Sequence, residues 1–126
     1  MKVIADLHIH SRFAMACSNR INVNALDEAA KSKGINLIST GDALHPEWNR
    51  ELKAHLEPAE PGLFKVRGSA TGTRFVLGAE VSTIFTEKDK VRKIHNCILL
   101  TSFESADALS VPCSIRDAAH RRWKSD

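Results

Sequence analysis

The sequence predicts an α/β fold with a largely parallel sheet, and three observations support this. Apolar runs of strand length occur at residues 2–9 and 35–40, and again within 73–85 and 92–100. Segments of helical periodicity separate the first three of these runs. His8 and His10 end the first run and Asp42 follows the second, at the strand ends where parallel α/β folds collect their chemistry. Glu80 lies within the third run, and His95 is an exception near the start of the fourth.

The first strand is expected at residues 2–9, and its opening residues predict that it is buried. Side chains in a strand point to alternate faces, so Asp6, His8 and His10 would share one face. Three polar, metal-capable groups in one row need a partner on that face.

The first helix is bounded by local signals at both ends. Asn22 is a favoured N-cap residue, and Gly34 is the residue type that most often follows a helix. Between them, apolar side chains recur at helical spacing: Val23, Leu26, Ala29 and Ala30. Residues 35–40 then predict a second apolar strand.

Pro46 suits the first position of a second helix, whose expected apolar face carries Trp48, Leu52 and Leu56. Residues 57–62 contain two prolines and a glycine and predict a loop. The third strand lies within 73–85 and the fourth at 92–100, separated by a charged turn. Residues 102–110 predict a short final helix.

The composition is that of one ordinary globular domain. The 126 residues are 43% hydrophobic and 26% charged, and a net charge of +3 permits a polyanionic substrate without arguing for one. Three widely spaced cysteines predict a reduced compartment. Asp6 interrupts any early apolar run, so we expect no signal peptide, no membrane contact and a cytoplasmic location.

Five candidate metal ligands come from four separate segments: His8, His10, Asp42, Glu80 and His95. Imidazole together with carboxylate is the ligand mixture of zinc, manganese or iron sites with exchangeable positions. A carboxylate such as Glu80 would bridge two ions, whose charge activates a water and stabilises a leaving oxyanion. The chemistry this indicates is hydrolysis of a phosphate ester.

Each of these residues also has a plainer interpretation when taken alone. The Asp-x-His-x-His row fits a strand with one solvated face, His95 fits a satisfied core histidine, and Asp42 fits a turn residue or helix cap. Glu80 is harder to explain in this way, because a carboxylate in an apolar strand is costly without a partner. The joint occurrence favours the metal site.

The motifs DLHIHS, STGD, LGAEVS and IHNCILL, spread over residues 1–110, resemble the PHP (polymerase and histidinol phosphatase) superfamily. The stretch INLISTGDALHPEW is most similar to its endonuclease Q branch. The resemblance implies a distorted β/α barrel with divalent metal ions at its mouth, zinc or manganese ahead of magnesium. It also implies phosphoester hydrolysis, and for this branch the nicking of DNA beside deaminated bases such as uracil and hypoxanthine.

Carried over by motif, His8 and His10 match the two histidines of the first family motif. Glu80 matches the bridging carboxylate and His95 the histidine of the next motif, while Asp42 stands where a histidine is more common. These five residues are the predicted metal ligands and act in catalysis through the bound metal. The residues expected to contact substrate or support the ligands are Asp6, Arg12 and His45.

The later ligands of the family have no counterpart in this sequence. We therefore expect residues 1–110 to be the N-terminal half of a truncated PHP-type barrel, with exposed sheet edges prone to self-association. Residues 111–126 are basic, lack strand periodicity and resemble an unrelated tail, of the kind that a shifted reading frame or early stop produces.

Three functions stay open at this point. The first is a metal-dependent phosphodiesterase of endonuclease Q type, and the second is a phosphatase acting on small phosphate monoesters. The third is a non-catalytic remnant. Candidate phosphate contacts are cationic side chains, each of which is more simply a solvated surface charge when taken alone: Arg12, Arg20, Lys88, Lys90, Arg92 and Lys93.

Overall fold

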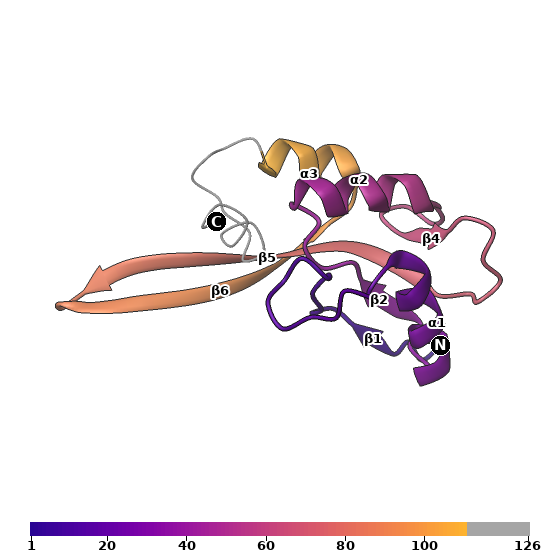
Figure 1. The fold of residues 1–126 in the computed structure, drawn as a ribbon, viewed down its shortest axis with the longest axis horizontal. Helices are drawn as coiled ribbons and strands as arrows, with labels where there is room; N and C mark the ends of the chain where they lie inside the picture. Colours follow the sequence, from indigo (N-terminus) through magenta and orange to yellow (C-terminus); the bar gives the residue numbers. More distant parts are fainter. Residues whose placement is uncertain (111–126) are drawn as a thin grey trace.

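The structure is a computed structural model that describes residues 1–110; the predicted basic tail lies outside the described residues. Its elements, in chain order, are β1 (Ala5–Asp6), α1 (Val23–Lys33), β2 (Leu37–Ser39), α2 (Pro46–His55), β3 (Leu56–Pro58), β4 (Phe64–Val66), β5 (Arg74–Glu87), β6 (Lys90–Leu100) and α3 (Phe103–Ser110) (Figure 1). Within this range, no helix is both long and apolar enough to cross a membrane.

The strands form a six-stranded mixed sheet in the order β1-β2-β5-β4-β3, with β6 also paired to β5. The predicted parallel pairing holds for β1 with β2 and for β2 with the first part of β5. The pairs β3–β4, β4–β5 and β5–β6 are antiparallel. The α/β class is therefore confirmed, with a mixed sheet in place of a largely parallel one.

The three helices pack around this sheet and cover its core. The largest fully buried side chains include Trp48 and Leu52 of α2 and Phe75 and Leu77 of β5. Helices α2 and α3 lie side by side (Figure 1), and Lys53 Nζ of α2 is 2.8 Å from an Asp107 carboxylate oxygen of α3. This packing fixes α2 directly beside the loop that follows β2.

The predicted first strand is shorter and more exposed than expected. Only Ala5–Asp6 is a strand, and Val3, Ile4 and Leu7 are 54%, 47% and 41% exposed. The reason is that β1 lies at the edge of the sheet, paired on one side only. The expectation of a buried strand over residues 2–9 was therefore wrong.

The predicted loop at residues 57–62 was also partly wrong. Helix α2 ends at His55, and β3 begins at the next residue, Leu56. Strand β3 pairs with β4 in the register Leu56↔Val66 and Pro58↔Phe64. Strands of three residues are too short to show a period of two. They are held by burial of Leu56, Phe64 and Val66 in the core.

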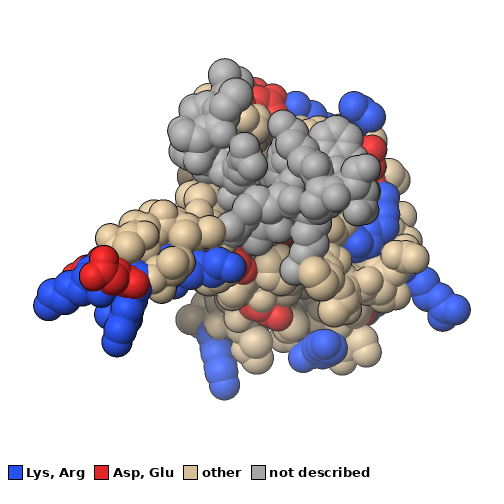
Figure 2. Space-filling view, turned by 60° about the vertical axis from the view of Figure 1, so that its left-hand side comes forward, with Lys and Arg blue, Asp and Glu red and all other residues tan. Residues whose placement is uncertain are grey.

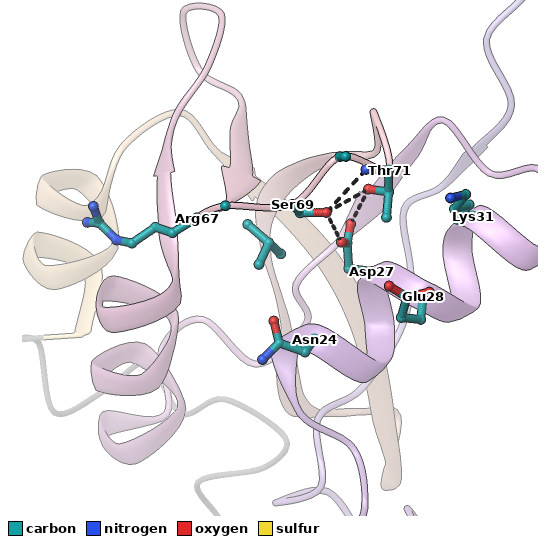
Figure 3. A pocket seen from close by; sticks show the side chains of 10 residues that line it. Asn24, Asp27, Glu28, Lys31, Arg67, Ser69 and Thr71 are labelled. Carbon is teal, nitrogen blue, oxygen red and sulfur yellow. Dashed lines mark hydrogen bonds between the residues drawn. The ribbon is translucent and has the colours of Figure 1, made fainter.

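A polar pocket of about 380 Å³ is lined by residues of α1 and of the loop that joins β4 to β5 (Figure 3). At its base the Asp27 carboxylate is buried and accepts hydrogen bonds from Ser69 Oγ (2.5 Å) and Thr71 Oγ1 (2.7 Å). Because a buried carboxylate needs such partners, this network ties the loop to α1 and so fixes the start of β5.

The second half of the β5–β6 hairpin leaves the body as a long two-stranded projection (Figure 1). We call residues 82–95 the arm; their register runs from Ser82↔His95 to Glu87↔Lys90. Lys88 and Asp89 form the two-residue turn at its tip, with φ of +47° and +60°. A turn of this hand matches the twist of the paired strands, and asparagine followed by glycine is its preferred sequence.

We expect the double substitution Lys88→Asn/Asp89→Gly to stabilise the arm by about 1 kcal/mol, because it relieves two left-handed backbone positions. Amide hydrogen exchange in the arm should slow by about fivefold. The substitution Lys88→Val, which places a β-branched side chain at positive φ, should speed exchange. Unchanged exchange in both variants would contradict the turn geometry.

Candidate metal centre

A carboxylate with imidazoles on both of its oxygens lies between the segment that follows β1 and the strands β5 and β6. His8 and His10 follow β1, Glu80 is on β5, and His95 is on β6. Glu80 Oε2 is 2.7 Å from His8 Nε2 and 3.2 Å from His10 Nε2. Glu80 Oε1 contacts His95 Nδ1, which is also 3.1 Å from Ser82 Oγ.

Glu80 is buried while its outer neighbours stay open to solvent. Its side chain is 10% exposed, against 55% for His8 and 47% for His95. Burial alone would raise the pKa of Glu80. The hydrogen bonds from His8 and His95, with the electrostatic attraction of the His10 imidazole, outweigh burial and leave this pKa below its ordinary value. Glu80 is therefore an ionised carboxylate at neutral pH.

The donor atoms suit a divalent metal ion. One ligand atom each from His8, His10 and Glu80 lies within 4.8 Å of the others, close enough to share one ion. Two imidazole nitrogens and a carboxylate oxygen are ligands that zinc and manganese accept. His95 contacts the other oxygen of Glu80, where a bridging carboxylate would meet a second ion.

Asp42 lies behind this group and contacts the far side of His10. It is fully buried in the loop that follows β2, and its Oδ1 is 3.2 Å from His10 Nδ1. Its Oδ2 accepts two hydrogen bonds of 2.6 Å from Ser11, one from the backbone N–H and one from Oγ. Both oxygens are thus engaged, as in a carboxylate that fixes the ring of a metal-binding histidine.

The loop after β2 approaches the histidine segment very closely. Gly41 has φ of +59°, and a Cβ at this position would lie 2.3 Å from the carbonyl oxygen of Ile9. The Trp48 indole N–H donates to the carbonyl oxygens of Thr40 (3.1 Å) and Gly41 (2.9 Å). Helix α2 therefore positions the loop, and the loop positions His10.

We expect Gly41→Ala to lower the free energy of unfolding by about 1–3 kcal/mol from backbone strain, with a further loss from the clash. Gly68→Ala is the matched control, since Gly68 has φ of +72° with nothing within 4 Å of its Cβ position. Urea denaturation of both variants separates the two causes. Equal losses would mean that the close approach to Ile9 is unimportant.

The three expected supporting residues do not contact Glu80. The Asp6 carboxylate accepts a long hydrogen bond (3.4 Å) from the backbone N–H of His8. Arg12 pairs with Glu51, which raises the pKa of the guanidinium, and donates to the carbonyl oxygen of Ile21 (3.0 Å). The side chain of Arg12 is therefore turned toward α2.

His45 is buried and caps α2. Its Nδ1 accepts a weak hydrogen bond (3.5 Å) from the backbone N–H of Trp48, and its ring stacks on Phe13 at 4.2 Å. The sequence predicted Trp48 only as part of the apolar face of α2 and gave no positioning role to Ser11 or Gly41, although all three position the candidate ligands. Ser11 and Gly41 act through contacts with Asp42 and Ile9, about thirty residues away in sequence, and a single sequence carries no signal for these.

Comparison with known proteins gave one relative and two solved structures. No family profile matches the chain. An uncharacterized protein of Methanocaldococcus jannaschii is 33% identical over 104 residues, covering 82% of this chain and 10% of that protein. The chain thus spans about a tenth of this relative.

The fold is similar to the crystal structure of the lesion-specific endonuclease PfuEndoQ from Pyrococcus furiosus, with a TM-score of 0.68 and 33% identity over 86% of this chain. It is equally similar, at 0.68 and 33%, to endonuclease Q in complex with a 27-mer duplex substrate with an abasic lesion at the active site. The chain spans 24% and 25% of those two chains. The resemblance expected from the motifs is therefore confirmed for endonuclease Q, as a similarity to about a quarter of that protein.

Proposed function

We propose that this chain provides part of a metal-dependent phosphodiesterase centre of endonuclease Q type that acts on DNA. The observation that carries the proposal is the group of His8, His10 and Glu80, whose ligand atoms lie within 4.8 Å of one another. The similarity to endonuclease Q in complex with a duplex supports DNA as the substrate class. We further propose that the sheet is the first part of a PHP-type barrel, made by residues 1–110.

In this proposal His8, His10 and Glu80 hold one divalent ion, and His95 on the other oxygen of Glu80 extends the site toward a second. Zinc or manganese suits this set better than magnesium, which prefers oxygen ligands. A bound ion would supply an activated water and charge stabilisation at the phosphate. Asp42 keeps the His10 ring in place through its Nδ1, so that Nε2 faces Glu80.

The exposed sides of His8 and His95 leave the outer face of the site open to a phosphate group. The same openness predicts slow catalysis, because three protein ligands on a solvent-exposed face would fix a bound ion poorly. A reacting group misplaced by about an ångström loses on the order of a hundredfold in rate. We therefore expect weak nicking by this 126-residue chain.

The test is incubation of the chain in excess with manganese or magnesium and a labelled duplex carrying uracil, hypoxanthine or an abasic site. We expect slow nicking 5′ of the lesion, absent with a chelator and with His10→Ala, and absent on undamaged duplex. A small phosphate monoester is assayed in parallel.

No nicking at any enzyme concentration by a chain that still binds metal would contradict the proposal and favour a non-catalytic remnant. Hydrolysis of the monoester alone would favour the phosphatase. Rapid, multiple-turnover nicking would overturn the expectation of a poorly fixed ion.

A further inference from the structure

The arm gathers an unusual share of the positive charge of the chain. Residues 82–95 carry four cationic side chains and two carboxylates, a net charge of +2 out of +3 for the whole chain. The cations are Lys88, Lys90, Arg92 and Lys93, and all are exposed. Figure 2 shows Lys and Arg side chains along the projecting arm, with acidic side chains at its tip.

Only one of these cations has an acidic partner in the described structure. Arg92 Nε is 3.5 Å from Glu87 Oε2, across the hairpin from it. Among the ion pairs within residues 1–110, none involves Lys88, Lys90 or Lys93. These three lysines can therefore meet an external anion without breaking a contact of the protein.

One face of the arm continues directly from the candidate metal centre. Directly opposed residues of an antiparallel pair share a face, and faces alternate along each strand. Ser82 opposes His95, and the next pair on that face is Ile84 with Lys93. Lys93 is thus two residues, about 7 Å along the strand, beyond His95.

The length of the arm suits a duplex better than a small ligand. Its six residues on β5, from Ser82 to Glu87, extend for about 20 Å, the rise of about six base-pair steps of DNA. Over this distance the arm presents unpaired lysines on both faces and at its tip, with Lys93 on the face of the metal centre, Lys90 on the opposite face and Lys88 in the turn. This spread of positive charge is complementary to the phosphates of a duplex held against the arm.

A second copy of this chain is a poorer binding partner for the arm than DNA. Pairing β6 of one chain with β6 of another would bring lysine-rich edges together, and lysines on an edge strand oppose such pairing. Apolar side chains such as Val91 (73% exposed) and Ile94 (48% exposed) alternate with the cations instead of forming a separate apolar stripe. Charge complementarity therefore favours a polyanion.

We propose that the arm, residues 82–95, binds the phosphate backbone of duplex DNA and directs it across the metal centre, with Lys93 contacting a phosphate beside the one that is cleaved. This inference rests on the proposed function for its choice of DNA. The interaction itself does not require a metal ion or a lesion. It is therefore testable separately from cleavage.

The experiment measures binding of the full chain to a fluorescent, lesion-free duplex of about 30 base pairs in chelator, over a series of salt concentrations. The arm variant is Lys88→Gln/Lys90→Gln/Lys93→Gln. The matched control, Lys2→Gln/Lys33→Gln/Arg50→Gln, removes the same charge from exposed positions on the body. A third variant changes the three arm lysines to arginine and keeps the charge.

The arm variant should lose about tenfold or more in affinity at low salt, with a salt-dependence slope smaller by about two to three, because each lost phosphate contact removes about 0.9. The control and the arginine variant should bind like the parent. An arm variant that binds like the parent, or a control that loses as much, would overturn the proposal.

Two further outcomes separate this proposal from its alternatives. A parent chain that binds the duplex through the arm in chelator but never cleaves it with metal present would contradict only the proposed function. If the arm variant changes the sedimentation of the free chain from dimer to monomer and leaves DNA binding intact, the arm is a self-association surface and the proposal fails.

Discussion

Replacing Trp48 with alanine is expected to lower the free energy of unfolding by about 3–5 kcal/mol, the range for truncating a large core aromatic. Trp48 is 0% exposed, and its indole N–H is bonded to the two carbonyl groups of the loop after β2. The substitution leaves a cavity under α2 and also releases the loop that carries Asp42. Urea denaturation of the parent and the variant measures the loss.

Trp48→Phe is the informative control. It keeps most of the ring volume but leaves the carbonyl oxygens of Thr40 and Gly41 without their donor, at a cost of about 1–3 kcal/mol. A smaller stability loss than in Trp48→Ala, with weakened metal binding, is expected. A stability loss below about 1 kcal/mol in Trp48→Ala would show that the indole is not part of a packed core.

Asp42→Asn should be the second most damaging substitution. The Asp42 carboxylate accepts three hydrogen bonds at a fully buried position, two from Ser11 and one from His10. An asparagine side chain accepts through one oxygen only, so its NH₂ group must face at least one of these donors. We expect a loss of about 2–4 kcal/mol in stability and a 10–100-fold loss in metal affinity.

Ser11→Ala serves as the comparison for this prediction. It removes one donor to Asp42 Oδ2 but leaves the contact with His10, so stability should fall by about 1 kcal/mol and metal affinity should change little. If Asp42→Asn bound metal as tightly as the parent, the contact between Asp42 and His10 would have no positioning role.

The sequence predicted the helices well because their signals are local. Asn22 caps α1 by accepting a hydrogen bond from the Ala25 N–H, and Gly34 ends it with φ of +71°. Pro46 begins α2 as expected. Such signals act within a few residues and need no partner from elsewhere in the chain.

The sheet and the surroundings of the site were predicted less well because they depend on distant partners. The extent of β1 depends on its edge position, and the hairpin of β3 and β4 depends on burial against the core. The contact of Asp42 with Ser11 joins residues 31 apart in sequence. The two strands of the arm and the charged turn between them were expected, but their antiparallel pairing was not, because the tip turn uses Lys-Asp in place of the usual asparagine and glycine.

The grouping of His8, His10 and Glu80 was expected from motif and residue type, and the structure places these three side chains together. The most direct test of the account is a calorimetric titration of the chain with manganese and with zinc. Two variants remove a proposed ligand, Glu80→Gln and His10→Ala. The control is His55→Ala, because His55 is exposed and its Nδ1–H donates to the Glu51 carbonyl on the same helix.

We expect the parent and the control to bind about one ion per chain, with an affinity that weakens as pH falls because the imidazoles must be neutral. Glu80→Gln keeps the shape and removes the charge that compensates the ion, so its affinity should fall by about a hundredfold, with a similar loss in His10→Ala. Normal affinity in Glu80→Gln, or loss in His55→Ala alone, would contradict the assignment of the metal centre.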